Sequence, residues 1–397
     1  MSSQPAIIIT SPPSWDIFCN VIDNYGDIGV CWRLARQLAG EYGLSVRLWV
    51  DDLASFVRLH PSADAQAALQ WCCGVQVCHW SQSFAGVQPA TVVIEGFGCQ
   101  LPASYLQAME TSPPVWINLE YLSAESWVEG CHGLPSPVRA MIRYFYFPGF
   151  VPATGGLLLE SGLLARRDAF CPDVGAKSRF WHSLGMLAPD PDTMIVSLFC
   201  YENGNVPELF EVWAGGTQRM LCLVPEGRVL PQVAAWFGDA AAAAGSRYVR
   251  GMLEVQVLPF VSQQQYDQLL WLCDLNFVRG EDSMVRAQWA AKPMLWHIYP
   301  QQDMAHWPKL EAFIDRYCAL LSHDDAMLVR HLMEAWNRGC GAGPLWQQYM
   351  GAWPRLHAHA GQWCSHLCED GGGSLAANLV DFSRQIMDSA APNLRGG

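Results

Sequence analysis

The chain has few basic residues for its length. Its 397 residues include 24 Lys and Arg against 37 Asp and Glu, which gives a formal net charge of −13 at pH 7. Binding to the phosphates of DNA or RNA requires a basic face, so this balance argues against nucleic acid as a partner. An acidic cleft would instead attract a protein that presents a basic loop.

The sequence also lacks a long apolar run. The three isoleucines at 7–9 are soon followed by Pro12 and Pro13, and no basic stretch precedes a long apolar segment. A signal peptide needs both features and a membrane span needs about 20 apolar residues, so we expect neither. The 15 cysteines are scattered through apolar segments, which is typical of buried thiols in a reduced protein. We therefore expect a cytoplasmic protein with no membrane partner.

Two motifs of cofactor and metal chemistry are missing. The dinucleotide fingerprint G-x-G-x-x-G is absent, which disfavours an oxidoreductase that uses NAD or FAD. Near the carboxyl end lie His357, His359, Cys364, His366 and Cys368, but no C-x-x-C pair accompanies them. An ordinary helix accounts for this spacing equally well, so we expect no metal and no cofactor.

The sequence does contain two series of short apolar strands that alternate with helices. An amphipathic helix is expected over 28–39, because Val30, Leu34 and Leu38 share one face. In the first series, strands are expected at 15–23, 44–50, 91–95 and 115–119. In the second, strands are expected at 193–200, 220–224, 253–260, 274–278 and 293–299, with helices at 263–273 and 283–291. Such alternation predicts an α/β fold with parallel, doubly wound sheets.

A chain of this length exceeds one core, so we expect two Rossmann-like domains that face each other across a cleft. The predicted limits are 1–172 for the first domain and 190–372 for the second. Between them, the polar and proline-bearing stretch 171–191 is the expected linker. The passage 135–156 is rich in proline and glycine and is expected to be irregular. Segment 373–397 contains a helix, near 375–387, that can cross back to the first domain.

Asp23 and Asp27 follow the first predicted strand. The carboxyl ends of parallel strands line the crevice in which α/β proteins bind ligands. A carboxylate held there can act as a general base. Alternatively, Asp27 caps the helix that starts at Ile28, and Asp23 ends its strand in a solvated turn. The residues alone leave both interpretations open.

A second strand end carries Arg279-Gly280-Glu281-Asp282-Ser283. The free N–H groups of a helix amino terminus, beside Arg279 and Arg286, suit a diphosphate. An acid among them could accept hydrogen bonds from sugar hydroxyls. The alternative is an ordinary helix start in which Asp282 or Ser283 is the N-cap.

Aromatic residues follow two further strands of the second series. Phe199 and Tyr201 come after one, and Phe260 comes after another, close to Gln263. Aromatic rings at these positions could enclose a base or a deoxyribose. Rings at strand ends are, however, usually part of the core or its rim.

Four segments in order along the chain resemble the EF-P arginine rhamnosyltransferases, the EarP family, and the resemblance covers nearly the whole length. The segments are 16–19 with 23–29 and 32–36, then 120–125, then 147–150 with 154–157, and finally 279–283 with 285–288 and 296–299. The chain departs from the family at Met284, where Phe is common, and at Gln302-Asp303-Met304, which replaces an Asp-Glu-Asn run.

The resemblance implies a GT-B glycosyltransferase with an acceptor-facing first domain and a donor-binding second domain. It implies inverting transfer of rhamnose from dTDP-β-L-rhamnose to an arginine of translation elongation factor P (EF-P), which activates that factor, with no metal or cofactor. By its motifs, the general base is Asp27, the second essential acid is Asp23 and the donor-domain acid is Glu281. The matching donor contacts are Arg279, Glu281, Asp282 and Ser283 for the diphosphate and sugar, and Tyr201, Phe260 and Gln263 for the nucleoside.

Three other functions remain open. The chain could be a GT-B transferase with another nucleotide sugar or acceptor. It could be a non-catalytic module that binds a nucleotide or a protein, although the retained acids argue against this. A Rossmann oxidoreductase is the third alternative, and the missing glycine fingerprint disfavours it.

Overall fold

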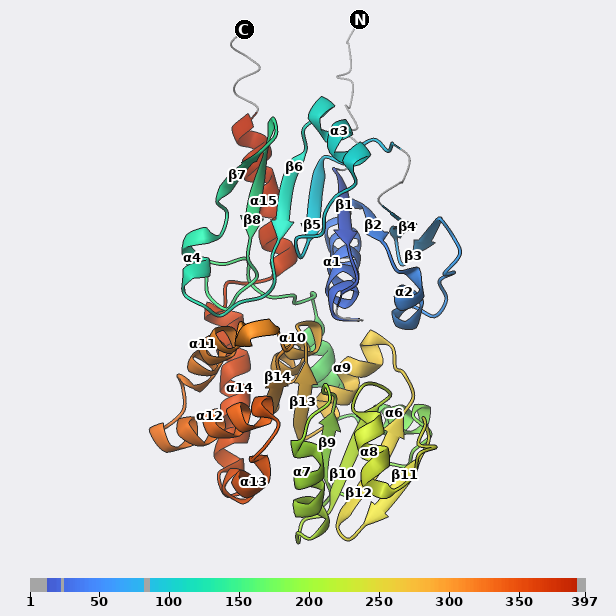
Figure 1. Cartoon of the computed structure of the whole chain (residues 1–397), viewed down its shortest axis with the longest axis vertical. Coiled ribbons are helices and arrows are strands. Elements are labelled where there is room, and N and C mark those ends of the chain that lie inside the picture. Colours follow the sequence, from blue (N-terminus) through green and yellow to red (C-terminus); the bar gives the residue numbers. More distant parts are fainter. Residues whose placement is uncertain (1–12, 23–24, 82–85, 391–397) are drawn as a thin grey trace, which may run out of the picture.

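Two α/β units lie one above the other along the long axis of the molecule (Figure 1). The structure is a computed structural model, and it describes residues 13–22, 25–81 and 86–390. Each unit is built on its own sheet, and the carboxyl ends of the central strands of both sheets point toward the junction between the units. The predicted α/β class with two facing Rossmann-like units is confirmed.

The first sheet has the order β3-β4-β2-β1-β5-β6-β8-β7. Its six inner strands are parallel, and β3 and β7 pair antiparallel at the two edges. Its strands are β1 Ser14–Cys19, β2 Ser45–Val50, β3 Leu69–Cys72, β4 Val75–His79, β5 Val92–Gly96, β6 Val115–Leu119, β7 Pro135–Val138 and β8 Met141–Tyr146. The helices of this unit are α1 Gly26–Tyr42, α2 Leu53–Leu59, α3 Ala103–Thr111 and α4 Trp127–Cys131.

The second sheet has the order β11-β12-β10-β9-β13-β14, and only β11 is antiparallel to its neighbour among the described strands of this sheet. Its strands are β9 Met194–Leu198, β10 Met220–Pro225, β11 Arg247–Arg250, β12 Leu253–Leu258, β13 Leu275–Arg279 and β14 Met294–His297. The helices that precede it or alternate with it are α5 Leu163–Phe170, α6 Val174–Ser183, α7 Asn205–Ala214, α8 Leu230–Phe237, α9 Gln263–Leu272 and α10 Asp282–Trp289. After the short turn η1 Gln302–Met304, the chain forms α11 Trp307–Cys318, α12 His323–Arg338, α13 Ala342–Gly351 and α14 Trp353–Asp370.

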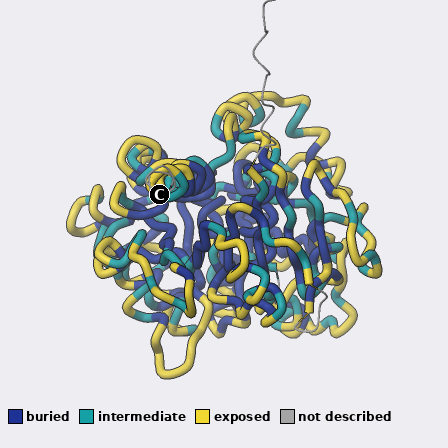
Figure 2. The backbone as a smooth tube through the Cα atoms, turned by 90° about the horizontal axis from the view of Figure 1, so that it is seen from above, coloured by how far each residue is buried: buried dark blue, intermediate teal, exposed yellow. Residues whose placement is uncertain are grey.

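The strands of both sheets form the buried interior, with exposed loops around them (Figure 2). The side chains of β1 from Trp15 to Cys19 are all buried, as expected for a parallel strand that is covered on both faces. β1 pairs with β2 in a register that places Trp15 opposite Val46 and Cys19 opposite Val50.

The last helix, α15 Leu375–Ala390, returns to the first unit, as predicted. The ring of Phe382 packs edge-on against the rings of Tyr144 and Tyr146 of β8. Just before α15, the carbonyl of Gly373 approaches Gly156 so closely that a β-carbon on Gly156 would lie 2.3 Å from its oxygen. The return of the chain therefore depends on a glycine at this crossing.

One expectation about loops was wrong, and another stays a prediction. The passage 135–156 contains the hairpin β7–β8, since the two prolines of β7 lie on an edge strand, where a missing N–H is tolerated. The stretch 171–191, the predicted linker, contains helix α6, whose N-cap Asp173 accepts a hydrogen bond from the N–H of Ala176; the role of this stretch as a linker stays a prediction. The domain limits at 172, 190 and 373 stay predictions.

Candidate functional site

The site is formed by two adjoining pockets at the junction of the two units. Gly26, at the start of α1, and Gly280, between β13 and α10, line both pockets. We call one the acidic pocket; it is lined by Ile22, Gly26, Asp27, Val30, Phe97, Tyr121, Gly280, Glu281, Trp296, Ile298, Tyr299, Gln301, His306 and Lys309. We call the other the aromatic pocket; it is lined by Tyr25, Gly26, Leu59, Phe199, Pro225, Glu226, Phe260, Val261, Gln263, Tyr266, Arg279, Gly280, Asp282 and Ser283.

Asp27 lies in the first turn of α1, at the wall of the acidic pocket, and is 3% exposed. Its Oδ2 accepts a hydrogen bond from the N–H of Ile22, at 2.9 Å. The hydroxyl of Tyr121, which follows β6, also donates to this carboxylate. The N-cap position is held by Tyr25, so the interpretation of Asp27 as the N-cap is wrong. Two donors instead fix the carboxylate in one orientation.

Tyr121 keeps its proton at neutral pH. Burial raises the pKa of its phenol, and the negative charges of Asp27 and Glu281 and the hydrogen bond to Asp27 raise it further. Its ring stacks on that of Phe97, with 4.7 Å between the centroids and 20° between the planes. The acidic pocket thus combines a carboxylate with two parallel aromatic rings.

Glu281 supplies the second carboxylate of the acidic pocket. Its Oε2 accepts from the N–H of Leu122 at 3.1 Å, and its Oε1 lies 3.4 Å from Nζ of Lys309 on α11. Burial raises the pKa of Glu281; Lys309 opposes this shift and the charge of Asp27 adds to it. Glu281 and Asp27 come from different units, and their carboxylates repel each other electrostatically.

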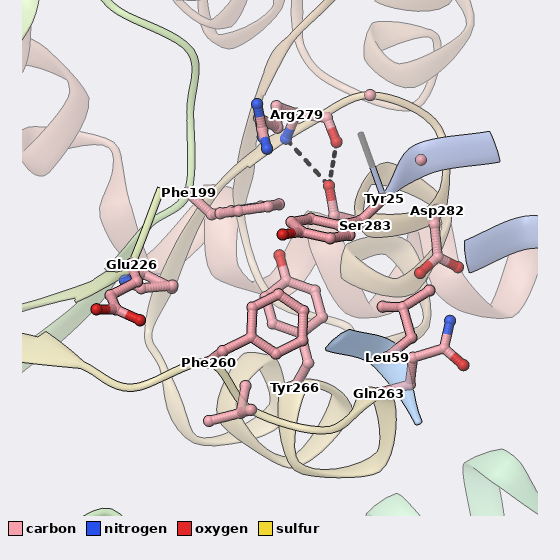
Figure 3. A pocket seen from close by; sticks show the side chains of 14 residues that line it. Tyr25, Leu59, Phe199, Glu226, Phe260, Gln263, Tyr266, Arg279, Asp282 and Ser283 are labelled. Atoms are coloured by element: carbon pink, nitrogen blue, oxygen red, sulfur yellow. Dashed lines mark hydrogen bonds between the residues drawn. The ribbon is translucent and has the colours of Figure 1, made fainter. Parts of the chain in front are cut away.

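Aromatic side chains from both units enclose the aromatic pocket (Figure 3). Phe199 follows β9, Phe260 follows β12 and Tyr266 lies on α9, and Tyr25 and Leu59 reach the pocket from the first unit. The ring of Tyr25 meets that of Phe260 edge-on, with 5.1 Å between the centroids. Such a set of rings can stack on a flat heterocycle.

Arg279, the last residue of β13, brings a buried positive charge to the aromatic pocket. It is 7% exposed, and its guanidinium carbon lies 4.6 Å from the ring centroid of Phe199 and 4.7 Å from that of Tyr201. Among the described residues, its Nη1 atom has no hydrogen-bond partner. An unpaired donor on a buried cation is costly, so this atom is suited to a bound anion.

The turn between β13 and α10 is tied together by Ser283. Its hydroxyl accepts a hydrogen bond from the N–H of Arg279, at 3.1 Å, and donates to the carbonyl of the same residue. The N-cap of α10 is Glu281, which makes no capping hydrogen bond with its side chain, so the expectation that Asp282 or Ser283 is the N-cap was wrong. Gly280 has a φ of 61°, the left-handed conformation that favours glycine.

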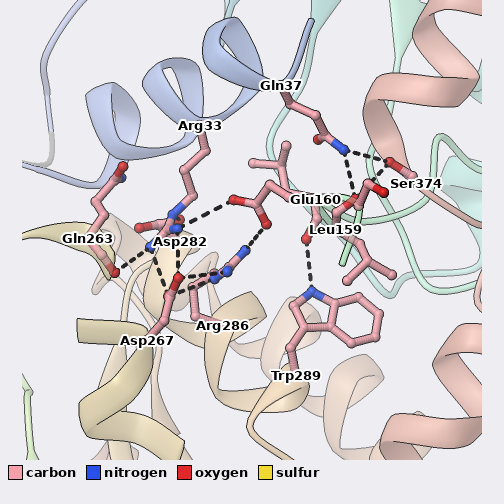
Figure 4. Close-up of polar contacts among 12 residues, drawn as sticks. Arg33, Gln37, Leu159, Glu160, Gln263, Asp267, Asp282, Arg286, Trp289 and Ser374 are labelled. Carbon is pink, nitrogen blue, oxygen red and sulfur yellow. Dashed lines mark hydrogen bonds and ion pairs between the residues drawn. The ribbon is translucent and has the colours of Figure 1, made fainter. Parts of the chain in front are cut away.

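A buried ion cluster, shown in Figure 4, includes Asp282, which also lines the aromatic pocket. Arg33 of α1 contacts Asp282 through Nε at 2.8 Å, and its two Nη atoms contact Asp267 at 3.2 and 3.1 Å. Arg286 binds the same Asp267 at 2.9 and 2.8 Å and binds Glu160 at 2.5 Å. Arg286, which we had placed beside the diphosphate, is thus occupied in this cluster.

Burial and neighbouring charges shift the pKa values of two acids in the cluster. Burial by itself would raise the pKa of Glu160, but the guanidinium groups of Arg286 and Arg33 lower it to about 2. Burial raises the pKa of Asp282, and Arg33 and Arg286 act against that shift. The cluster joins α1 of the first unit to α9 and α10 of the second through charge-assisted contacts.

Most of the predicted site residues lie together at these pockets. Asp27 and Glu281 line the acidic pocket, and the aromatic pocket is lined by Phe260, Gln263, Arg279, Asp282 and Ser283. Tyr201 lines neither; its ring centroid lies 4.7 Å from the guanidinium carbon of Arg279, and Phe199 lines the aromatic pocket instead. Asp23 lies outside the described residues.

Sequence reasoning missed several residues of the site. Tyr121 lies two residues after the carboxyl end of β6, a parallel strand, so the strand-end rule could have found it. Lys309 lies on α11, and Leu59 at the end of α2, where no sequence pattern marks them. The residues of the tail cluster all lie on α14, and within the described ranges no three His, Cys, Asp or Glu side chains are grouped to hold a metal. In the same ranges no helix is long and apolar enough to cross a membrane.

The chain is similar in sequence to known protein-arginine rhamnosyltransferases and similar in fold to a further protein. The protein-arginine rhamnosyltransferase of Pseudomonas putida is 53% identical over 337 residues, which cover 84% of this chain and 89% of the relative. That of Neisseria meningitidis is 38% identical over 347 residues, which cover 83% and 86%. MurG of Acinetobacter baumannii shares the fold, with a TM-score of 0.50 at 12% identity over 94% of this chain and all of that one.

A solved structure described as "Structural basis for EarP-mediated arginine glycosylation of translation elongation factor EF-P" has a TM-score of 0.69 and 39% identity. The alignment covers 94% of this chain and 99% of that chain. The family model described as "Elongation-Factor P (EF-P) rhamnosyltransferase EarP" matches residues 15–384. The chain therefore belongs to the EarP family of EF-P rhamnosyltransferases, glycosyltransferases with the GT-B fold.

Proposed function

We propose that this chain transfers rhamnose from dTDP-β-L-rhamnose to a guanidinium nitrogen of one arginine in EF-P, with inversion at the anomeric carbon. One observation carries the proposal: two pockets meet at Gly26 and Gly280, one holding a buried cation with an unpaired donor and the other two carboxylates. The names of the relatives, all protein-arginine rhamnosyltransferases, support this choice of reaction.

The aromatic pocket is the proposed site of the donor nucleotide. Phe199, Phe260 and Tyr266 offer ring faces and edges to the thymine and deoxyribose. The diphosphate lies at Nη1 of Arg279 and at the amino end of α10, where free N–H groups and the helix dipole favour an anion. The sugar then extends past Gly280 toward the acidic pocket.

The acidic pocket is the proposed site of the acceptor arginine. Its two carboxylates attract a guanidinium and can accept its N–H bonds. The stacked rings of Phe97 and Tyr121 add an apolar wall against which a planar cation can lie. The net charge of −13 on the whole chain favours approach of a basic loop.

Arginine is a weak nucleophile because it stays protonated, with a pKa above about 12. A carboxylate, whose usual pKa is near 4, cannot remove that proton before attack. Asp27 instead hydrogen-bonds the guanidinium, orients one nitrogen toward the anomeric carbon and accepts its proton as the C–N bond forms. The two donors to Asp27, Ile22 N–H and Tyr121 O–H, hold it in that direction.

The bond from the anomeric carbon to the diphosphate oxygen breaks as the C–N bond forms, so negative charge grows on dTDP. Arg279 and the amino end of α10 stabilise that charge. Glu281, held by Leu122 and Lys309, is placed to bind sugar hydroxyls or the guanidinium. With protein groups assigned to each charge, the reaction is proposed without a metal or cofactor. The part of Asp23 as a second acid stays a prediction.

The proposal is tested by incubating the protein with EF-P and a set of nucleotide sugars, followed by intact-mass measurement of EF-P. We expect the mass increment of one deoxyhexose with dTDP-β-L-rhamnose and none with UDP-glucose or dTDP-glucose. Transfer from another donor would favour a GT-B transferase of different specificity. Binding of dTDP or EF-P without any increment would favour a non-catalytic module. Because the acceptor is a translation factor, the proposal also assigns the protein to the cytoplasm.

A further inference from the structure

Helix α1, which carries Asp27, also contacts the second unit along one of its faces. Three residues on one of its faces, Gly29, Arg33 and Arg36, contact the second unit, and their spacing of four and then three residues places them in line along the helix. The partners of this face are Gln263 at the start of α9 and Asp282 at the start of α10, both of which line the aromatic pocket.

Gln263 is bound on both ends of its side-chain amide by α1. Its Nε2 donates to the carbonyl of Gly29 at 3.1 Å, and its Oε1 accepts from Nη2 of Arg36 at 2.8 Å. These two contacts also fix which end of the amide is the oxygen, because Arg36 can only donate. The orientation of Gln263 in the pocket is therefore set by the other unit.

Asp282 is held by α1 through an ion pair rather than a hydrogen bond. Its Oδ1 lies 2.8 Å from Nε of Arg33, a residue that is 2% exposed. A β-carbon on Gly29 would lie 3.3 Å from Oδ2 of Asp282 and 3.5 Å from Nε2 of Gln263. Glycine at position 29 thus permits the close approach that both contacts need.

We propose that Arg33 and Arg36 are positioning residues for the donor: from the first unit, they orient Asp282 and Gln263, so that the nucleotide pocket of the second unit is complete only while α1 is docked against it. The inference rests on the proposed function in taking the aromatic pocket as the dTDP site. By linkage, bound nucleotide stabilises the docked position of α1, which also holds Asp27 at the acidic pocket.

A double-mutant cycle on dTDP affinity tests the inference, with calorimetry on the full chain. Arg36 does not line the pocket, yet Arg36→Met should raise the dissociation constant of dTDP by about tenfold, the effect of one lost charge-assisted hydrogen bond. Because Arg36 acts through Gln263, the double variant Arg36→Met with Gln263→Ala should bind dTDP no more weakly than Gln263→Ala alone. A general loss of stability would not produce this pattern.

Arg166 provides the matched control. It lies on α5, and its Nη1 donates to the carbonyl of Ser161 at 3.1 Å. Arg166→Met should leave dTDP affinity unchanged, alone and in combination with Gln263→Ala. Arg36→Lys, which keeps a donor near Gln263, should recover part of the loss.

Gly29→Ala provides an independent test of the proposal if the Arg36→Met variant fails to fold. Alanine favours the helix, so α1 itself should be at least as stable, whereas the added methyl lies tightly against Oδ2 of Asp282, at 3.3 Å. We expect weaker binding of dTDP. Additive losses in the cycle, or wild-type affinity in both Arg36→Met and Gly29→Ala, would overturn the inference. Absence of dTDP binding by the wild-type protein would instead contradict the proposed function.

Discussion

Among single residues, Asp27 is expected to act in the transfer step and not in binding of the donor. Of the two pockets, Asp27 lines the acidic one only, and the amide oxygen of Asn at this position can still accept from the N–H of Ile22. We expect Asp27→Asn to reduce turnover roughly 10²- to 10⁴-fold, the usual contribution of a proton acceptor, with dTDP affinity close to that of the wild type. Steady-state kinetics and calorimetry measure the two effects.

The control for Asp27→Asn is Asp51→Asn. Asp51 follows the neighbouring strand β2 and also accepts a backbone N–H, that of Val21, but it lines neither pocket. Its substitution should change turnover little. Loss of dTDP binding in Asp27→Asn would instead assign Asp27 to the donor site.

Arg279 is expected to act on the diphosphate alone. Arg279→Ala should weaken dTDP binding about tenfold or more, because a charge-assisted hydrogen bond to a buried anion is lost. The affinity for thymidine, which has no phosphate, should change much less, and calorimetry with both ligands separates the two. Arg250→Ala is the control, since Arg250 also lies over an aromatic ring, that of Trp236 at 3.8 Å, outside both pockets. Equal losses for dTDP and thymidine would refute the placement of the diphosphate.

Residue types and strand ends predicted much of the site. The residues that this prediction missed were missed for physical reasons. Arg279 ends β13, Phe260 lies two residues after β12, and Asp27 lies in the first turn of the helix that follows β1; the carboxyl ends of these parallel strands face the cleft. Phe199 and Tyr201 lie two positions apart in the loop after β9. Only the course of that loop decides which of the two side chains lines the aromatic pocket. The partner of Asp282, Arg33, is 249 positions away in sequence, and no local pattern could pair them.

At the scale of elements, the ion cluster ties α1 to α9 and α10 and to Glu160, which comes just before α5. The pKa of Glu160 is about 2 in the folded protein against 4.5 as its ordinary value. Because the folded value is the lower one, its contribution to stability is complete above about pH 4.5 and is lost as the pH falls toward 2.

Glu160→Gln should therefore lower the free energy of unfolding at pH 7 by about 3 kcal/mol, and should flatten its pH dependence between 4.5 and 2. Urea unfolding followed by tryptophan fluorescence at several pH values measures both. Glu110→Gln is the control, since Glu110 forms an exposed pair with Arg139 and such pairs contribute little. An equally steep loss of stability in Glu160→Gln and wild type between pH 4.5 and 2 would contradict the assigned role.

The elements that the sequence did not predict are those with weak patterns. The edge strands β3, β7 and β11 have four residues each, too short for a clear alternation of polar and apolar residues. The inner parallel strands β4 and β8 were missed as well. The other inner parallel strands were predicted to within a few residues, because burial on both faces makes them almost continuously apolar. The start of α1 was placed two residues late, because Asp27 was taken as a possible cap.

In the whole molecule, the two pockets adjoin each other at the junction of the units and share Gly26 and Gly280 in their linings. This arrangement favours a direct displacement: the guanidinium enters from the side of Asp27, and dTDP leaves on the side of Arg279. No covalent intermediate is then needed, and one displacement inverts the anomeric carbon.

The proposed direct displacement is tested by the anomeric configuration of rhamnose on the arginine of EF-P, determined by NMR after transfer from dTDP-β-L-rhamnose. The control is the unreacted donor, whose β configuration is checked in the same spectra. The account predicts an α-L-rhamnosyl arginine. A β-linked product, formed with retention, would contradict the direct displacement across the two pockets.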